Sequence, residues 1–133
     1  MPDDIRVAIR SNLDIVTARQ EGRALAAYIG FTATDVTLIA TAISELARNI
    51  VSYARHGEIL LSVVEGANTR GVMIVSRDAG PGISNVDDAM RDGFSTSGGL
   101  GLGLPGVRRL MDEFAIESAV GRGTTVCIKK WLR

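Results

Sequence analysis

The stretch FSTSGGLGLGLPG, residues 94–106, decides the fold of this chain. It holds five of the fifteen glycines in the sequence: Gly98, Gly99, Gly101, Gly103 and Gly106. So many glycines are unfavourable inside a helix or a strand, because each one loses backbone entropy on folding and contributes no side-chain packing. The composition therefore predicts a loop whose bare backbone comes close to a ligand.

A helix is expected directly after this loop. Pro105 has the fixed φ that suits a first helical turn, and apolar residues from Leu104 onward recur at helical spacing as far as Phe114. A glycine loop that leads into a helix N-terminus presents oriented N–H groups and a positive dipole end, which favour an anion and most often a phosphate. We therefore interpret the loop as a nucleotide phosphate loop, with a lid over residues 94–99.

Two well-known glycine loops do not fit. Gly101, Gly103 and Gly106 have the G-x-G-x-x-G spacing of dinucleotide-binding loops, but that loop follows a buried strand and this one follows the polar residues 95–97. The P-loop needs Gly-Lys followed by Ser or Thr, which the sequence lacks. A plain linker is disfavoured, because leucine alternates with glycine here and an amphipathic helix follows.

Composition limits the function further. The length of 133 residues predicts a single domain over residues 1–133. Fifteen basic residues balance fifteen acidic ones, so the net charge gives no electrostatic basis for binding nucleic acid or a membrane surface. The longest apolar run, residues 24–29, is too short to span a bilayer, and acidic residues stand where a secretory signal has bases. One cysteine, Cys127, excludes an internal disulfide. We expect a cytoplasmic protein without nucleic-acid or membrane partners.

Hydrophobic periodicity predicts the other elements. The expected strands are residues 5–9, 58–64, 72–77, 116–120 and 124–131, and the expected helices are residues 13–29, 34–54 with Thr34 as cap, 86–92 and 104–114. Three long helices and about five strands in separate blocks, without strict alternation, predict an α+β sandwich with a mixed or antiparallel sheet.

The second helix carries two polar residues opposite its apolar stripe. Glu45 and Asn49 lie one turn apart on one face, and Leu38 and Ala42 on the same side indicate that something covers this face. A carboxylate and an amide oxygen at this spacing suit a proton acceptor and a ligand for a hard cation. A solvated polar face is the alternative that the helix alone leaves open.

Two further segments have a structural and a functional interpretation. Asp78 follows a β-rich run and precedes Gly80-Pro81-Gly82. Such an aspartate commonly forms a turn with its own backbone; alternatively, it is a buried acceptor for the amino group of a planar base, with Gly82 letting that base lie close. The segment GRGTT, residues 121–125, is either a plain hairpin turn or a further part of the same site.

Taken in order, four segments resemble the motif boxes of the GHKL ATPases, the superfamily of gyrase, Hsp90, histidine kinases and MutL. Three other segments narrow the resemblance to the RsbT-type serine kinases of bacterial stressosomes, which are relatives of the anti-sigma factor kinases. Leu102 departs from this branch, where a smaller residue is expected. The four boxes are residues 45–49, 78–82, 99–103 and 121–124, and the narrowing segments are residues 44–49, 92–99 and 104–114.

The resemblance implies a two-layer sandwich of the Bergerat type, with about three helices covering one face of the sheet. It also implies site residues for ATP and Mg²⁺. Glu45 would be the general base, Asn49 the Mg²⁺ ligand, and Asp78 the acceptor for the adenine amino group with support from Thr124. Gly80 and Gly82 would make room for the base, and Arg48 would form a surface ion pair or neutralise γ-phosphate charge. The phosphates would lie along Ser97, Gly98, Gly99, Leu100, Gly101, Leu102 and Gly103.

The implied function is a Mg-ATP-dependent serine/threonine protein kinase. Its substrates would be STAS-domain antagonist or stressosome proteins, and by partner switching it would activate a PP2C-type phosphatase in a stress-signalling pathway. The alternative is an anti-sigma factor that binds and sequesters a sigma factor. The catalytic domain of a histidine kinase is disfavoured because the sequence has no phosphoacceptor helix. An inactive nucleotide sensor is disfavoured because both Glu45 and Asn49 are present.

Overall fold

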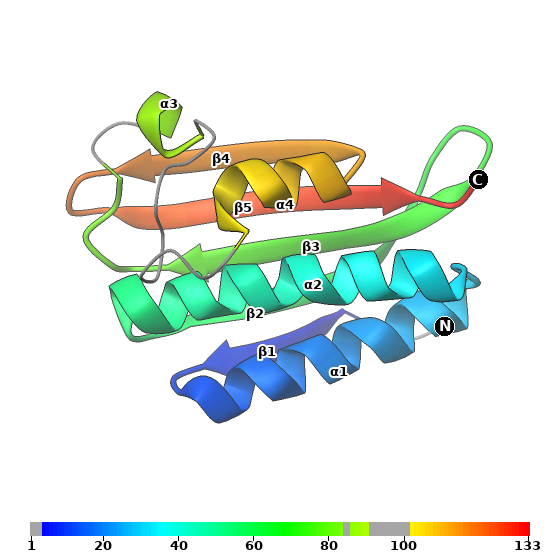
Figure 1. Cartoon of the computed structure of the whole chain (residues 1–133), viewed down its shortest axis with the longest axis horizontal. Helices are drawn as coiled ribbons and strands as arrows, with labels where there is room; N and C mark the ends of the chain where they lie inside the picture. The colour runs from blue at the N-terminus through cyan, green and yellow to red at the C-terminus, as the bar shows by residue number, and fades with distance from the viewer. Residues whose placement is uncertain (1–3, 84–85, 91–101) are drawn as a thin grey trace.

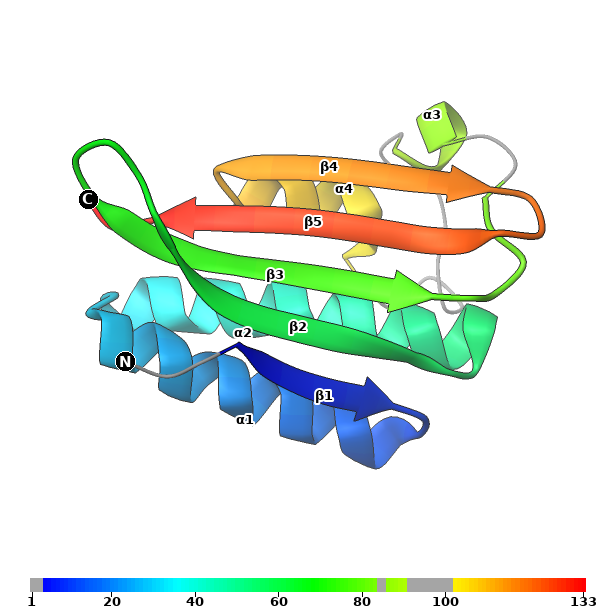
Figure 2. The same cartoon turned by 180° about the vertical axis from the view of Figure 1, so that it is seen from behind.

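The computed structural model describes residues 4–83, 86–90 and 102–133, which form two layers (Figure 1). The helices of residues 12–29, 33–49 and 103–110 lie on one face of a sheet, and the view from behind shows the opposite face without a described helix (Figure 2). The strands are β1 (Ile5–Ile9), β2 (Gly57–Glu65), β3 (Arg70–Asp78), β4 (Glu113–Ala119) and β5 (Gly123–Trp131). The helices are α1 (Asn12–Ile29), α2 (Ala33–Asn49), α3 (Val86–Ala89) and α4 (Gly103–Leu110), with a π-helical turn η1 (Ile50–Ala54) after α2.

The sheet has the order β1-β2-β3-β5-β4, and every neighbouring pair is antiparallel. The predicted α+β sandwich is therefore confirmed, and of the two predicted sheet types the antiparallel one is present. Within the described residues, no helix is long and apolar enough to cross a membrane.

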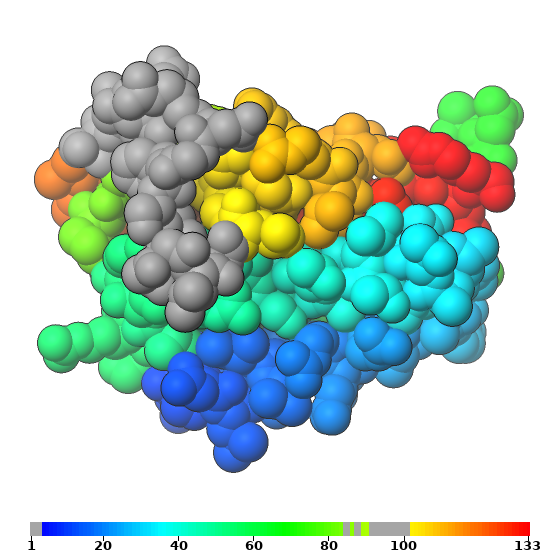
Figure 3. Space-filling model, in the orientation of Figure 1, coloured from blue at the N-terminus to red at the C-terminus, as the bar shows by residue number. Residues whose placement is uncertain are grey.

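The core lies between the sheet and the helices. Inward side chains of β2, β3 and β5 alternate along each strand, as a sheet with one covered face requires. Gly22 lets α1 approach α2, because a Cβ at this position would collide with the Ile43 side chain. Figure 3 shows α1, α2 and α4 packed in rows on this side of the molecule. Completely buried side chains at the centre include Ile39, Ile43, Ile59, Leu61, Ile74 and Ile128.

Several predicted boundaries were wrong. Thr32, and not Thr34, caps α2, and its hydroxyl accepts a hydrogen bond from the Asp35 N–H at 3.2 Å. The α-helical hydrogen bonding of α2 ends at Asn49, and the chain continues as η1. The helix after the glycine loop ends at Leu110, because Met111 has extended backbone angles. Phe114 belongs to β4. Its spacing from Val107 and Leu110 also fits a helix, but in the structure Phe114 follows the alternating burial of the strand.

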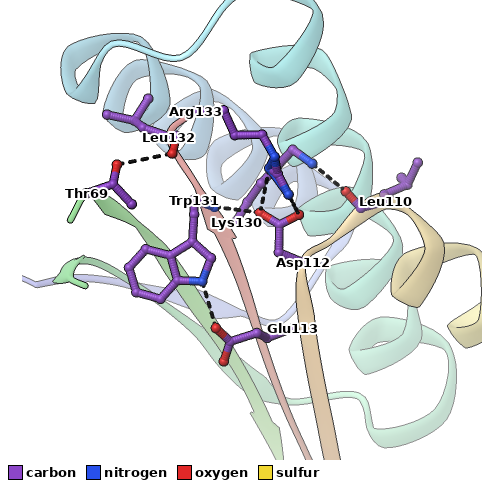
Figure 4. A network of polar contacts seen from close by, with 8 residues as sticks. All are labelled: Thr69, Leu110, Asp112, Glu113, Lys130, Trp131, Leu132 and Arg133. Atoms are coloured by element: carbon purple, nitrogen blue, oxygen red, sulfur yellow. Dashed lines mark hydrogen bonds and ion pairs between the residues drawn. The ribbon is translucent and has the colours of Figure 1, made fainter. Parts of the chain in front are cut away.

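The C-terminal end of α4 is tied to β5 and to the residues after it (Figure 4). Lys130 is only 9% exposed, and its ammonium group donates to the Leu110 carbonyl at 2.9 Å. Asp112 accepts from the Trp131 N–H at 2.8 Å and from Arg133 at 2.7 Å, and the Trp131 indole N–H donates to Glu113 at 2.7 Å. These bonds hold α4 in place, so that its first residues have a defined position beside α2.

Candidate functional site

A cavity of about 340 Å³ lies where α2 and η1 meet the ends of β3 and β5. We call it the central cavity. A mostly apolar wall with a few converging polar groups is typical of a small-molecule site. Its polar lining consists of Asn49, Tyr53, Ser76, Asp78 and Thr124, and its other lining residues are Leu46, Ile50, Pro81, Gly82, Ile83, Ala89, Leu104 and Val126.

Asp78 is held at one of its two carboxylate oxygens. Its Oδ1 accepts from the Gly80 N–H at 2.9 Å and from the Thr124 N–H at 3.2 Å. Thr124 is the cross-strand partner of Asp78 in the pairing of β3 with β5. Among the described residues, none donates to Oδ2. The turn-forming interpretation of Asp78 is correct, and Asp78 also lines the central cavity.

The glycines around Asp78 are required by contacts within the protein. Gly82 has φ +79°, and a Cβ on it would collide with the Ala119 carbonyl. A Cβ on Gly80 would collide with Ala54 at the end of η1. The Gly121 N–H also donates to the Pro81 carbonyl at 2.8 Å, so the loop after β3 lies against the β4–β5 hairpin. Gly82 lines the central cavity, and Gly80 is not among its lining residues.

Asn49 presents an unsatisfied acceptor. Its Oδ1 is buried and has no hydrogen-bond partner in the part of the chain that the structure describes. Leaving a buried acceptor unpaired costs about 1–3 kcal/mol, so such an atom indicates a place for a donor or a cation. The described residues contain no group of three His, Cys, Asp or Glu side chains that could hold a metal ion. A cation at Asn49 would therefore take its other ligands from a bound phosphate and water, as Mg²⁺ commonly does.

Glu45 lies one turn before Asn49 and lines a different cavity. This second cavity, which we call the arginine cavity, has a volume of about 430 Å³. Glu45 is only 1% exposed, and its Oε1 accepts from the Arg48 guanidinium at 2.8 Å and from the Leu102 N–H at 3.2 Å. The predicted ion pair of Arg48 is thus present, with Glu45 as its partner. The arginine cavity is lined by Arg19, Arg23, Thr37, Ala40, Thr41, Ser44, Glu45, Arg48 and Leu102.

The structure brings most of the described site residues to the two sides of the start of α4. Asn49, Asp78, Gly82 and Thr124 share the central cavity with Leu104. Glu45 accepts a hydrogen bond from the Leu102 N–H, directly before α4, and Arg48 bonds to the same oxygen of Glu45. Leu102 is 43% exposed, and Gly103 begins α4 with φ +70°. The predicted phosphate-loop residues Ser97, Gly98, Gly99, Leu100 and Gly101 lie outside the described residues.

Three polar residues near the central cavity were missed by the sequence analysis. Tyr53 lines the cavity from η1 and is 49% exposed. Its position four residues after Asn49 could have indicated it, since residues at this spacing share a helix face. Ser76 lies two residues before Asp78 on β3 and points to the same face. Ser118 on β4 bonds to the Thr124 hydroxyl at 2.7 Å, and no signal along the sequence joins these two residues.

Comparisons with known proteins show the family of this chain. Residues 10–130 match the family described as the histidine kinase-like ATPase domain. The chain is 52% identical over its 133 residues to the serine/threonine-protein kinase RsbT of Bacillus subtilis (strain 168), with both chains covered completely. It is 34% identical over 120 residues to an anti-sigma F factor of Geobacillus thermodenitrificans (strain NG80-2), covering 85% of this chain and 81% of the relative.

Solved structures show the same fold. The structure of the RsbU and RsbW domains of Rv1364c from Mycobacterium tuberculosis superposes with a TM-score of 0.66 at 19% identity, covering 99% of this chain and 33% of that one. The mycobacterial sensor histidine kinase MprB superposes with a TM-score of 0.57 at 14% identity, covering 98% of this chain and 97% of that one. The chain therefore belongs to the histidine kinase-like ATPase family, as a protein serine/threonine kinase of the RsbT type.

Proposed function

We propose that this chain is a Mg-ATP-dependent kinase that phosphorylates serine or threonine on STAS-domain proteins. The observation that carries the proposal is the central cavity, in which the unpartnered Asn49 Oδ1 and the Asp78 carboxylate converge, with Glu45 one turn away on the same helix. Phosphoryl transfer depends mainly on positioning and charge stabilisation, so a small set of fixed groups is sufficient.

The adenine base fits the end of the cavity at β3 and β5. Asp78 Oδ2 would accept a hydrogen bond from the exocyclic amino group, while Oδ1 stays bonded to Gly80 and Thr124. The apolar side chains of Leu46, Ile50 and Ile83 line the same cavity and suit the faces of a planar ring. The Gly80-Pro81-Gly82 loop is held by its own contacts, and Gly82 adds no side chain where the base would lie.

The phosphates would lie toward Asn49 and the start of α4. The first N–H groups of a helix have no partner within the helix itself, and its N-terminus is a positive dipole end. Mg²⁺ held by Asn49 Oδ1 would neutralise phosphate charge and orient the transferred group. The predicted roles of residues 97–101 along the phosphates are part of this proposal.

Glu45 would accept the proton of the incoming hydroxyl, and the acceptor protein would reach it through the arginine cavity. In the structure, Arg48 and the Leu102 N–H both bond to Glu45 Oε1, so the carboxylate has a fixed position. Arg19, Arg23 and Arg48 give this cavity a positive lining. An acceptor segment with acidic residues beside its serine complements such a lining.

The partners follow from the resemblance to RsbT-type kinases. We propose a STAS-domain protein as substrate and a PP2C-type phosphatase as the partner that is activated after the kinase is released. The 34% identity to an anti-sigma F factor supports a second candidate function, the sequestration of a sigma factor. The identity of 52% to a kinase favours the first candidate.

A phosphotransfer assay with a matched pair of variants tests the proposal. The purified chain is incubated with radiolabelled ATP, Mg²⁺ and the STAS-domain proteins of the same cell. Glu45→Gln keeps the size of the side chain but removes the base, so it should bind ATP normally and lose about 10²–10⁴-fold in phosphotransfer rate. Glu21→Gln, an exposed glutamate on α1, should behave as the wild type.

Two results would contradict the proposal. One is phosphotransfer by Glu45→Gln at the wild-type rate, which would remove Glu45 from the chemistry. The other is a wild-type protein that labels no STAS-domain protein but is captured by a sigma factor in a pull-down, which would favour the second candidate function.

A further inference from the structure

Ser118 lies in one row with Thr124 and Asp78 across three neighbouring strands. Ser118 on β4 is the cross-strand partner of Thr124 on β5, and Thr124 is in turn the partner of Asp78 on β3. Figure 2 shows these strands side by side. Directly opposed side chains of neighbouring strands are close enough to bond, and the Ser118 and Thr124 hydroxyl oxygens are 2.7 Å apart.

Ser118 also joins the loop after β3 to the hairpin. Its Oγ accepts a hydrogen bond from the Ile83 N–H at 2.7 Å and donates one to the Gly123 carbonyl at 3.1 Å. Both Ile83 and Thr124 line the central cavity. Ser118 is therefore bonded to two segments of the cavity wall, although it is not itself among the lining residues.

The hydroxyl protons of Ser118 and Thr124 can be assigned from this geometry. A hydroxyl donates one hydrogen bond and can accept two. The Gly123 carbonyl offers Ser118 an acceptor, whereas the only acceptor for the Thr124 hydroxyl among the described residues is Ser118. Both protons are used when Thr124 donates to Ser118 and Ser118 donates to Gly123. The Thr124 oxygen then presents only lone pairs to the cavity.

We propose that Ser118 is a positioning residue that fixes Thr124 as a hydrogen-bond acceptor and so makes the site select a 6-aminopurine over a 6-oxopurine. The inference rests on the proposed function, and it identifies a residue that determines which purine base the proposed nucleotide site selects. Asp78 Oδ2 and the Thr124 oxygen are both acceptors, which an amino group with two N–H donors complements. A 6-oxo oxygen at the same place faces two acceptors and finds no donor.

Removing the Ser118 hydroxyl changes this selection. Without its acceptor, the Thr124 proton becomes free to turn into the cavity and donate to a 6-oxo oxygen. ITP is the probe, because it differs from ATP only at the 6-position and N1 of the purine. The dissociation constants of ATP and ITP are measured for wild type, Ser118→Ala, the near-isosteric Ser118→Cys, and Ser118→Thr, which keeps a hydroxyl. Circular dichroism melting checks that each variant is folded.

We expect the preference for ATP over ITP to fall about tenfold in Ser118→Ala, with a smaller fall in Ser118→Cys, and to stay within about twofold of wild type in Ser118→Thr. In Ser118→Ala, the dissociation constant of ITP should fall relative to that of ATP, so that the ratio changes and the two constants do not simply rise together. In a Thr124→Val background, Ser118→Ala should leave the preference unchanged, because the hydroxyl that it acts through is gone.

The outcomes separate this inference from the proposed function. Should the folded Ser118→Ala variant weaken ATP and ITP equally, Ser118 merely supports the loop, and the inference is wrong while the proposed function stands. The same conclusion holds if Ser118→Ala shifts the preference for ATP over ITP as much in the Thr124→Val variant as it does in the wild type. A wild-type protein that does not bind ATP contradicts the proposed function and this inference together.

Discussion

The two cavities on either side of the start of α4 are built in different ways. Around the central cavity, Asp78 and Thr124 stand on paired strands, and the Thr124 backbone N–H donates to the Asp78 carboxylate. Around the arginine cavity, the charged groups are Arg19 and Arg23 on α1 with Glu45 and Arg48 on α2, at the ends of long side chains. The first arrangement is fixed by the sheet. In the second, Glu45 is buried and held by its bonds, whereas the exposed arginines of α1, Arg19 and Arg23, can adapt through side-chain rotation.

This difference suits the proposed arrangement, with the nucleotide in the central cavity and the acceptor protein at the arginine cavity. The purine base of a nucleotide is rigid and planar, so recognising it benefits from groups that do not move. A protein substrate presents a segment whose exact approach varies, and flexible arginines can follow it at a cost in side-chain entropy. Substitutions in the central cavity should therefore have large effects on nucleotide affinity. Substitutions of Arg19 or Arg23 in the arginine cavity should have smaller effects, confined to the acceptor protein.

The largest effect in this comparison is expected for Asp78→Asn. The amide can keep the oxygen that bonds to Gly80 and Thr124, but it places an NH₂ group where Oδ2 would accept from adenine. ATP affinity should fall about 100-fold, because two donors then oppose each other in a partly buried site. Isothermal titration calorimetry measures the change. Unaltered ATP affinity would show that the central cavity does not bind the base through Asp78.

The next effect concerns Asn49 and depends on the metal. Asn49→Ala removes the Oδ1 atom that has no partner within the described residues. Affinity for ATP in the presence of Mg²⁺ should therefore fall about tenfold, while affinity for ATP in EDTA should change by less than about twofold. Titrations with and without Mg²⁺ give the two values. An equal loss in both conditions would assign Asn49 to the nucleotide directly and not to the cation.

A smaller effect is expected from the arginine cavity. Arg23→Ala should raise KM for the acceptor protein about threefold to tenfold and leave the dissociation constant of ATP unchanged, because only the acceptor would contact this side. Arg122→Ala, at an exposed position in the β4–β5 turn, serves as the control. A change in ATP affinity for Arg23→Ala would mean that the two cavities are not separate in function.

The smallest effect is expected at the far end of α4. Lys130→Met keeps most of the side-chain volume but removes the donor to the Leu110 carbonyl, so it should lower the free energy of unfolding by about 1 kcal/mol. Lys129→Met, which loses only a long ion pair to Glu113 at 3.7 Å, is the control. Urea denaturation measures both variants. Equal stability of the two would show that the Lys130 bond does not hold α4.

Much of the fold could be predicted from the sequence, because its signals are local. Alternation in residues 5–9 and helical spacing in residues 13–29 reflect which face each element buries, and both elements are present with bounds changed by a residue or less. Helix ends were less predictable. Phe114 fits the spacing of α4 as well as the alternation of β4, and only the extended backbone at Met111 decides between them.

Four predicted residues, Asn49, Asp78, Gly82 and Thr124, line one cavity, but the sequence did not predict that Glu45 lines a second one. Helical geometry correctly placed Glu45 and Asn49 one turn apart, yet it could not show that Leu102 bonds to Glu45 while Leu104 lines the cavity beside Asn49. Those contacts depend on how α4 packs against α2. Ser118 was missed for the same reason, because its partners Ile83 and Gly123 are known only once the loop and the strands are paired.

The row of Ser118, Thr124 and Asp78 has a consequence for folding as well as for binding. Thr124 shares its side of β5 with the buried Val126 and Ile128. A slip of β5 by one residue would turn all three side chains to the opposite surface. The hydrophobic contacts that exclude such a slip are thus the same ones that assemble the polar row, so a molecule that has buried its core correctly has also completed this edge of the site.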